Sequence, residues 1–178
     1  MTYKFTSDWF SHHIPNWEVY VKPYLKSLIK PKILEIGAFE GRSTLWFLNE
    51  IPNSLITVID NWDGEFNGAY DRFIFNTREF KQRITVIRDS SEKMKFLDPN
   101  AYDAIYIDGD HRSEIVIRDL IFSVNLLKSN GILILDDYLG GDGSKEYPKP
   151  AIDFFDVLYK DEKYKKLFDG YQQIYQKI

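Results

Sequence analysis

Five short apolar runs, separated by stretches of helical pattern, constrain the fold of this chain more than any other feature. The runs are rich in Ile, Leu or Val and cover residues 33–36, 55–59, 84–87, 104–107 and 132–135. Continuous apolar strands that alternate with helices are typical of a parallel sheet whose crossover helices cover both faces. The sequence therefore predicts an α/β fold built on a doubly wound, mostly parallel sheet.

The segments between and after these runs predict the remaining elements. Apolar spacing predicts a helix from near Ser43 to before Pro52, another over residues 70–80, and a third over residues 112–128 that Asn130-Gly131 closes. Residues 164–168 and 171–178 read as a β-hairpin around a two-residue Asp169-Gly170 turn. Residues 1–31 are expected to form helices that pack over the sheet or cover a ligand as a lid.

Length and composition limit the classes of protein. A chain of 178 residues fits a single domain, 1–178, with a helical segment 1–31 and a core 32–178. The absence of cysteine excludes disulfides, thiolate zinc sites and a cysteine nucleophile, and it suits a cytoplasmic protein. A net charge of -4 argues against nucleic acid as the partner, and no apolar run reaches membrane-spanning length. The sequence leaves open whether the protein forms a homodimer.

The first apolar run leads into a glycine loop, Glu35-x-Gly37-x-x-x-Gly41. A strand that feeds such a loop and then a helix commonly holds a nucleotide-like ligand at the carboxyl edge of a sheet. A dinucleotide loop has a second glycine where this chain has Phe39, so a pyrophosphate would meet a bulky side chain. The loop favours a ligand without phosphate, although a tight turn with no ligand has the same sequence.

The loop resembles the first motif of the class I S-adenosylmethionine-dependent methyltransferases. The resemblance implies a Rossmann-like, seven-stranded sheet with an antiparallel C-terminal strand, and S-adenosylmethionine as cofactor. Carried onto this chain, the cofactor-binding residues are Glu35, Gly37, Ala38, Phe39, Gly41, Ser43, Asp60, Asn61, Trp62, Asp89, Ser90 and Asp108. Most of these positions follow the first four apolar runs.

Two of the positions that follow the second and third runs, Trp62 and Asp89, have a structural alternative. Asp60 lies about twenty residues after the glycine loop, where a carboxylate accepts hydrogen bonds from ribose hydroxyls. The Trp62 indole would pack on the ribose or adenine, or would belong to the core or surface. Asp89 would accept from the adenine amino group, or Ser90 or Ser91 would cap a helix with Glu92 close behind.

Acidic residues follow the fourth and fifth runs. Asp108 follows one run, and Asp136-Asp137 follows the other. If the strands are adjacent, these carboxylates converge and repel one another unless a cation lies between them, and oxygen ligands suit Mg²⁺ or Mn²⁺. The arrangement resembles catechol O-methyltransferase and related metal-dependent sugar O-methyltransferases, which implies that Asp108, Asp136 and Asp137 bind the metal.

His111 is the expected general base, three residues after Asp108, where the catechol enzyme has a lysine. Its alternative is a histidine at a helix start. His12 and His13 are expected to be a surface pair, and Tyr138 and Tyr147 are candidate acceptor contacts.

The sequence thus predicts an O-methyltransferase whose acceptor is a small molecule or glycan with neighbouring hydroxyls, with Asp108 and His111 as its catalytic residues. Two alternatives remain. Asp108-Gly109-Asp110 would be the Asp-x-Asp motif of a metal-dependent nucleotide-sugar glycosyltransferase, or the chain would be a non-catalytic S-adenosylmethionine-binding module.

Overall fold

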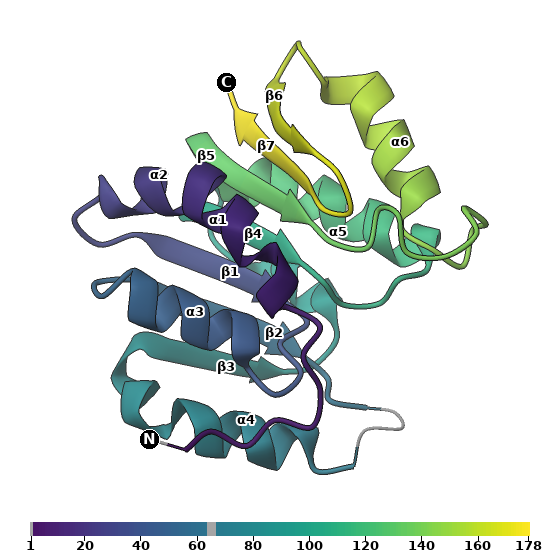
Figure 1. The fold of residues 1–178 in the computed structure, drawn as a ribbon. Coiled ribbons are helices and arrows are strands. Elements are labelled where there is room, and N and C mark those ends of the chain that lie inside the picture. The colour runs from purple at the N-terminus through teal and green to yellow at the C-terminus, as the bar shows by residue number, and fades with distance from the viewer. Residues whose placement is uncertain (1, 64–66) are drawn as a thin grey trace.

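A seven-stranded sheet runs through the middle of the protein in the order β3-β2-β1-β4-β5-β7-β6 (Figure 1). The computed structural model describes residues 2–63 and 67–178. The strands are β1 (Lys32–Ile36), β2 (Leu55–Asp60), β3 (Ile84–Arg88), β4 (Tyr102–Ile107), β5 (Leu127–Leu135), β6 (Tyr164–Asp169) and β7 (Gln173–Lys177). The first five strands are parallel, and β7 lies antiparallel to both β5 and β6. This confirms the predicted α/β fold and its antiparallel C-terminal end.

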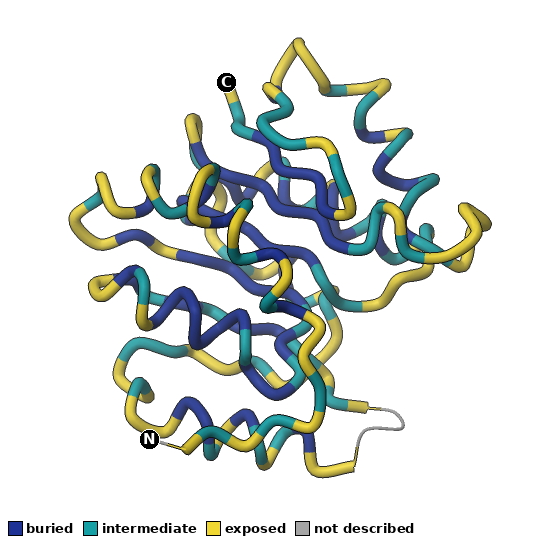
Figure 2. The backbone as a smooth tube through the Cα atoms, in the orientation of Figure 1, coloured by how far each residue is buried: buried dark blue, intermediate teal, exposed yellow. Residues whose placement is uncertain are grey.

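Helices cover both faces of the sheet. One face packs against α1 (Ile14–Tyr20), α2 (Lys22–Lys26), α3 (Arg42–Glu50) and α4 (Ala69–Thr77), and the other against α5 (Ser113–Leu126) and α6 (Lys149–Tyr159). Short 3-10 helices η1 (Ser11–His13), η2 (Arg78–Arg83) and η3 (Ser91–Phe96) lie in the connections. Figure 2 shows the central strands buried and the loops at the margins exposed. No helix among the described residues is long and apolar enough to cross a membrane.

The parallel ladder continues past the ends of the central strands. The amide of Gly37 donates to Ile59 O at 2.9 Å, and that of Asp108 donates to Ile36 O at 2.8 Å. The Asp136 amide likewise donates to Ile107 O at 3.0 Å. Because each bond aligns one strand end with its neighbour, the residues that follow β1, β2, β4 and β5 share one edge of the sheet.

The helix predicted over residues 112–128 is two residues shorter at its C-terminal end than expected. It ends at Leu126, and β5 begins at Leu127, so Asn130 (φ 64°) and Gly131 lie inside the strand and do not cap the helix. Lys177 Nζ donates to Val124 O and Leu127 O, both at 2.7 Å. The last carbonyls of the helix are therefore satisfied by a cation from β7, which the local sequence does not reveal.

The predicted hairpin is confirmed, but the predicted two-residue turn is wrong. Asp169 pairs with Gln173, so residues 170–172 form the connection between β6 and β7. The Tyr138 amide donates to Tyr171 O at 2.9 Å, and the Gln172 side chain is fully buried. These tertiary contacts draw the connection onto the end of β5 and override the local preference of Asp-Gly for a tight turn.

We expect Gly37→Ala to destabilise the fold strongly. Gly37 has φ 82°, and a Cβ there would lie 1.9 Å from the backbone oxygen of Asp108. Gly143→Ala is the matched control, because Gly143 also has a positive φ (77°) but its Cβ would approach only Lys149, at 4.0 Å. Backbone strain alone costs on the order of 1 kcal/mol, and the clash at Gly37 adds to it. Urea unfolding of the two variants measures the difference, and equal losses of stability would contradict this reading of Gly37.

Candidate functional site

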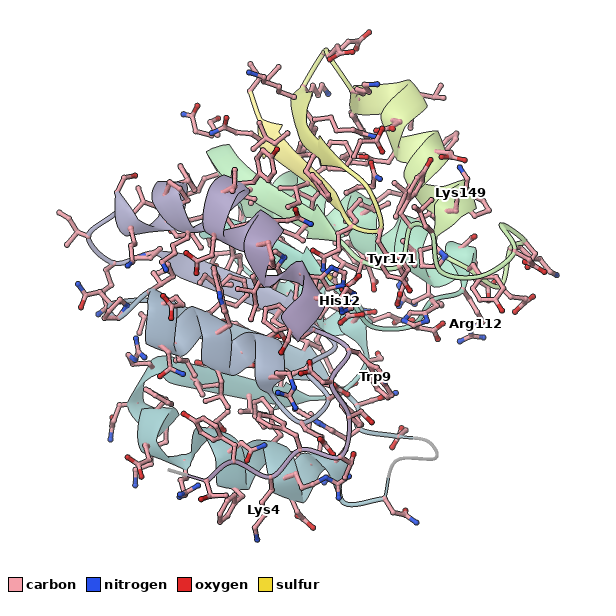
Figure 3. The ribbon with its side chains drawn as sticks, in the orientation of Figure 1. Lys4, Trp9, His12, Arg112, Lys149 and Tyr171 are labelled. Atoms are coloured by element: carbon pink, nitrogen blue, oxygen red, sulfur yellow. The ribbon has the colours of Figure 1, made fainter. Side chains whose placement is uncertain are left out.

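A cavity of about 820 Å³ opens along the carboxyl edge of the sheet. Its walls come from the loop after β1, the ends of β2, β4 and β5, the start of η3 and α5, the N-terminal segment, and Tyr171. Trp9, His12, Arg112 and Tyr171 all line it and gather beyond the strand ends in Figure 3. The volume is in the range of small-molecule and cofactor sites.

Most of the residues predicted as site residues line this cavity. They are Gly37, Ala38, Phe39, Ser43, Asp60, Asn61, Trp62, Asp89, Ser90, Asp108, His111, Asp136 and Asp137. The fold therefore brings together residues spread over a hundred positions of the chain. Glu35 and Gly41 are predicted cofactor contacts that do not line it.

Glu35 is fully buried and faces helix α3 instead of the cavity. Its carboxyl group accepts hydrogen bonds from Ser43 Oγ and from Thr44 Oγ1, the latter at 2.6 Å. Burial raises the pKa of Glu35 to about 7, against the opposing effect of these two hydroxyls. The Glu35 side chain therefore joins β1 to the first turn of α3, and its predicted contact with the cofactor stays a prediction.

Gly41 also has a structural role. It precedes α3 with φ 84°, and a Cβ there would lie 2.9 Å from the Phe73 ring. Phe39, by contrast, lies on the cavity with φ 50° and stacks on Trp9, with ring centroids 4.9 Å apart and planes at 25°. The loop therefore presents an aromatic surface where a dinucleotide loop presents a glycine.

The Asp60 carboxylate holds the glycine loop. Its Oδ2 accepts from the amides of Ala38 (2.8 Å) and Phe39 (2.9 Å), and its Oδ1 accepts from that of Trp62 (2.7 Å). A carboxylate has about four acceptor positions, so one remains for a ligand hydroxyl. The Trp62 indole donates to Phe39 O at 2.7 Å and packs on Tyr70 and Phe73. Trp62 thus belongs partly to the core and partly to the cavity wall.

The η3 end of the cavity is polar. Asp89 Oδ1 accepts from the Ser90 amide at 2.8 Å, and Oδ2 lies 3.2 Å from Lys93 Nζ. The hydrogen bond from the Ser90 amide is the main cause that lowers the pKa of Asp89. Ser90 occupies the N-cap position of η3, but its hydroxyl makes no capping hydrogen bond. Both side chains remain available to a ligand at this end of the cavity.

Asp108, His111 and Asp137 form the acidic cluster of the site. One ligand atom from each lies within 4.8 Å of the others, and His111 Nε2 lies 2.9 Å from Asp137 Oδ2. Burial, then the charges of Asp136 and Asp137, raise the pKa of Asp108 well above its usual range. Burial also pushes up the pKa of Asp137, but hydrogen bonds from His111 and Tyr171 outweigh this and lower it. Two carboxylates and an imidazole in this arrangement fit a divalent cation.

Asp136, a predicted metal ligand, lies outside this cluster, because protein donors hold its carboxylate oxygens. It is only 7% exposed, and protein donors contact both of its oxygens. Tyr106 OH and Gln172 Nε2 donate to Oδ2, and the Asp137 amide donates to Oδ1 at 2.8 Å. His111 therefore replaces Asp136 in the group whose atoms are close enough to share an ion.

The N-terminal segment forms a wall that the sequence only partly anticipated. Glu40, inside the glycine loop, accepts from Thr6 N and Thr6 Oγ1, both at 2.7 Å, and pairs with Arg72. The Lys4 amide donates to Asn76 Oδ1 at 2.7 Å, and Asn76 Nδ2 donates to Lys4 O at 2.9 Å. These bonds bring Trp9 and His12 to the cavity, whereas α1 and α2 pack over the sheet, so each of the two expectations for the N-terminal segment applies to a different part of it.

The predicted surface pair of histidines is wrong. His12 lines the cavity, and His13 is buried with Nε2 3.4 Å from Asp136 Oδ1. Burial, together with the nearby His12, lowers the pKa of His13 to about 4, so its imidazole is neutral. The sequence carried no periodic signal that could place them here.

The two tyrosines expected at the acceptor do not line the cavity. Tyr138 OH donates to Asp153 and accepts from Lys149 Nζ, each at 2.8 Å. Tyr147 lies in the loop between β5 and α6, where its backbone oxygen accepts from Ser113 Oγ at 2.6 Å. The tyrosine that the site does use is Tyr171, whose hydroxyl donates to Asp137 Oδ1 at 2.6 Å.

Comparison with known proteins identifies the family. Residues 34–138 match a family profile described as a methyltransferase domain, and the chain belongs to this family. The resemblance to class I methyltransferases is confirmed. The match sets aside the glycosyltransferase alternative, and Asp110 pairs with Arg112 at 2.6 Å instead of joining the cluster. None of the curated protein sequences matches this chain.

Solved structures share the fold at low sequence identity. An O-methyltransferase from Bacillus cereus in complex with SAH has a TM-score of 0.71 at 14% identity, over 98% of this chain and 84% of that one. TomG, an O-methyltransferase from Streptomyces achromogenes in complex with SAM, has a TM-score of 0.64 at 14% identity, over 83% of this chain and 73% of that one. A candidate rRNA methylase from Clostridium thermocellum has a TM-score of 0.68 at 19% identity, over 88% of this chain and 95% of that one. Their similarity shows the fold of this chain.

Glu35→Gln tests the structural role of the buried carboxyl group. Since its folded pKa of about 7 lies above the usual 4.5, Glu35 stabilises the fold fully below pH 4.5 and loses this contribution as the pH rises to about 7. The loss is on the order of 3 kcal/mol. Chemical unfolding from pH 4.5 to 7.5 should show a smaller decline in the variant than in the parent. The other buried carboxyl groups are present in both the parent and the variant. Identical declines in the free energy of unfolding would therefore contradict the structural role of Glu35.

Proposed function

We propose that this methyltransferase transfers the methyl group of S-adenosylmethionine to a hydroxyl of a small molecule or glycan with neighbouring hydroxyls, assisted by Mg²⁺ or Mn²⁺. The supporting observation is that one cavity joins the glycine loop to the Asp108, His111 and Asp137 cluster. The SAH and SAM complexes of the neighbouring O-methyltransferases agree with the cofactor.

The cofactor-binding half of the cavity fits an adenosyl amino acid. Gly37, Ala38 and Phe39 would hold its amino-acid part, and the free acceptor position on Asp60 suits a ribose hydroxyl. Asp89 and Ser90 would contact the adenine. The acidic character of this edge favours a cationic sulfonium over an anionic diphosphate. The bound cofactor supplies an electrophilic methyl group.

The other half of the cavity fits a hydroxylated acceptor. Asp108 and Asp137 would hold the cation, which lowers the pKa of a hydroxyl bound to it. His111 removes the acceptor proton, and Asp137 orients its imidazole through the 2.9 Å contact. Trp9 and His12 also line the cavity. Positioning and charge stabilisation supply most of the rate.

Turnover with radiolabelled S-adenosylmethionine on a panel of sugars and catechols tests the proposal. We expect EDTA to abolish transfer and Mg²⁺ or Mn²⁺ to restore it, because Asp108 and Asp137 otherwise repel each other at the acceptor. Full turnover after exhaustive chelation would contradict the metal assignment. Tight cofactor binding without transfer to any acceptor would favour the non-catalytic module.

His111→Ala should lower turnover about 10²- to 10⁴-fold, the usual contribution of a general base. Calorimetry should find its affinity for S-adenosylhomocysteine nearly unchanged. His12→Ala is the control, because His12 lines the same cavity outside the acidic cluster. Unchanged turnover of the His111 variant would reduce His111 to a residue at a helix start. Loss of Mn²⁺ binding by that variant would make it a ligand instead of the base.

A further inference from the structure

Gln172 connects two distant parts of the protein through one buried side chain. It lies between β6 and β7 with no exposed surface. Its Oε1 accepts from Trp17 Nε1 of α1 at 2.8 Å, and its Nε2 donates to Asp136 Oδ2 at 2.8 Å. An indole N–H only donates and a carboxylate only accepts, so the two partners fix the orientation of the amide.

The contact continues to the acidic cluster through Tyr106. Asp136 Oδ2, which Gln172 holds, also accepts from the Tyr106 hydroxyl, and that hydroxyl contacts Asp108 Oδ2 at 2.8 Å. Tyr106 is 1% exposed, and its ring packs edge-on against Trp17. Trp17, Gln172, Asp136, Tyr106 and Asp108 thus form a continuous series of polar contacts that ends on a side chain of the cavity, and in this series the single Tyr106 proton lies between the two carboxyl groups.

Because these polar side chains are buried, the orientation of each depends on its hydrogen-bond partners. An unsatisfied polar group in such surroundings costs more free energy than the bond itself contributes, so the carboxyl group of Asp136 keeps the orientation that its donors dictate. Gln172 donates to the same oxygen as Tyr106, and of these two donors it is the one that forms a hydrogen bond with Trp17 of α1. Loss of its N–H donor would free Asp136 to turn and would move the Tyr106 hydroxyl away from Asp108.

We propose that Gln172 is a positioning residue: through Asp136 and the Tyr106 hydroxyl it holds Asp108 in the orientation that the site needs. This inference rests on the proposed function, in which Asp108 holds a divalent cation. Trp17 and Gln172 both lie outside residues 34–138, which match the family profile. The segments outside the common domain would therefore set the geometry of its acidic site.

The test compares Gln172→Met with Gln173→Met. Gln173 is equally buried in the next position, but its Nε2 donates to Gly170 O and does not reach the acidic residues. Mn²⁺ affinity is measured by calorimetry or electron paramagnetic resonance on the protein saturated with S-adenosylhomocysteine. Thermal unfolding and the affinity for S-adenosylhomocysteine are recorded for each protein.

We expect Gln172→Met to weaken Mn²⁺ binding about 10- to 100-fold, as loss of a group that orients metal ligands does. Its affinity for S-adenosylhomocysteine should stay close to that of the parent, and Gln173→Met should keep both affinities. Gln172→Glu is the second variant, in case the Met protein does not fold. It keeps the shape and the acceptor for Trp17 and replaces the amide donor to Asp136, so it should also weaken Mn²⁺ binding.

Two outcomes would overturn the inference. If the parent and a folded Gln172 variant bind Mn²⁺ equally, or if Gln173→Met weakens binding as much, Gln172 has a structural role alone and the proposed function stands. If the parent binds no Mn²⁺, the metal assignment of the proposed function fails, and the inference fails with it.

Discussion

The in-register parallel pairing of β1 with β2 and β4, and of β4 with β5, is the constraint on which the rest of the structure depends. Backbone hydrogen bonds extend each ladder by one residue beyond the strand, to Gly37, Asp108 and Asp136. A slip of one residue would turn every strand side chain to the opposite face. The pairing therefore fixes the two apolar faces and the acidic edge at the same time.

The acidic edge carries an electrostatic cost that the surrounding side chains reduce. Asp108, Asp136 and Asp137 lie close together in partly buried surroundings, and burial is the first cause that raises the pKa values of Asp108 and Asp136. Hydrogen bonds from Gln172, Tyr171 and His111 stabilise the charged forms, as does the one Tyr106 proton that lies between Asp108 and Asp136. These donors come from β4, the β6–β7 connection and the β4–α5 loop. The edge is thus supported from several parts of the fold, and a cation would complete this support.

The glycine loop shows how one short segment can serve both fold and ligand. Gly37 allows the loop to approach Asp108, while Gly41 makes room for Phe73. Asp60 binds two loop amides, and Glu40 binds the N-terminal segment. The wall that carries Trp9 is therefore attached to the loop that would hold the cofactor.

The sequence by itself predicted the parallel sheet, its alternation with helices as far as α5, and the positions of the strand-end residues, because apolar periodicity and glycine spacing act locally. It did not predict α6. It also predicted that Asp108, Asp136 and Asp137 lie close together, since residues that end adjacent parallel strands must meet. Their roles, and that of His111, stay predictions. Only the tertiary structure decided which way each side chain points. Glu35 turns to α3, Asp136 turns to Gln172, and the 170–172 connection bends onto β5. Those choices depend on partners far away in the chain, such as Trp17, 155 residues from Gln172. Local pattern carries no record of such contacts, so packing and hydrogen-bond satisfaction in the folded protein decide them.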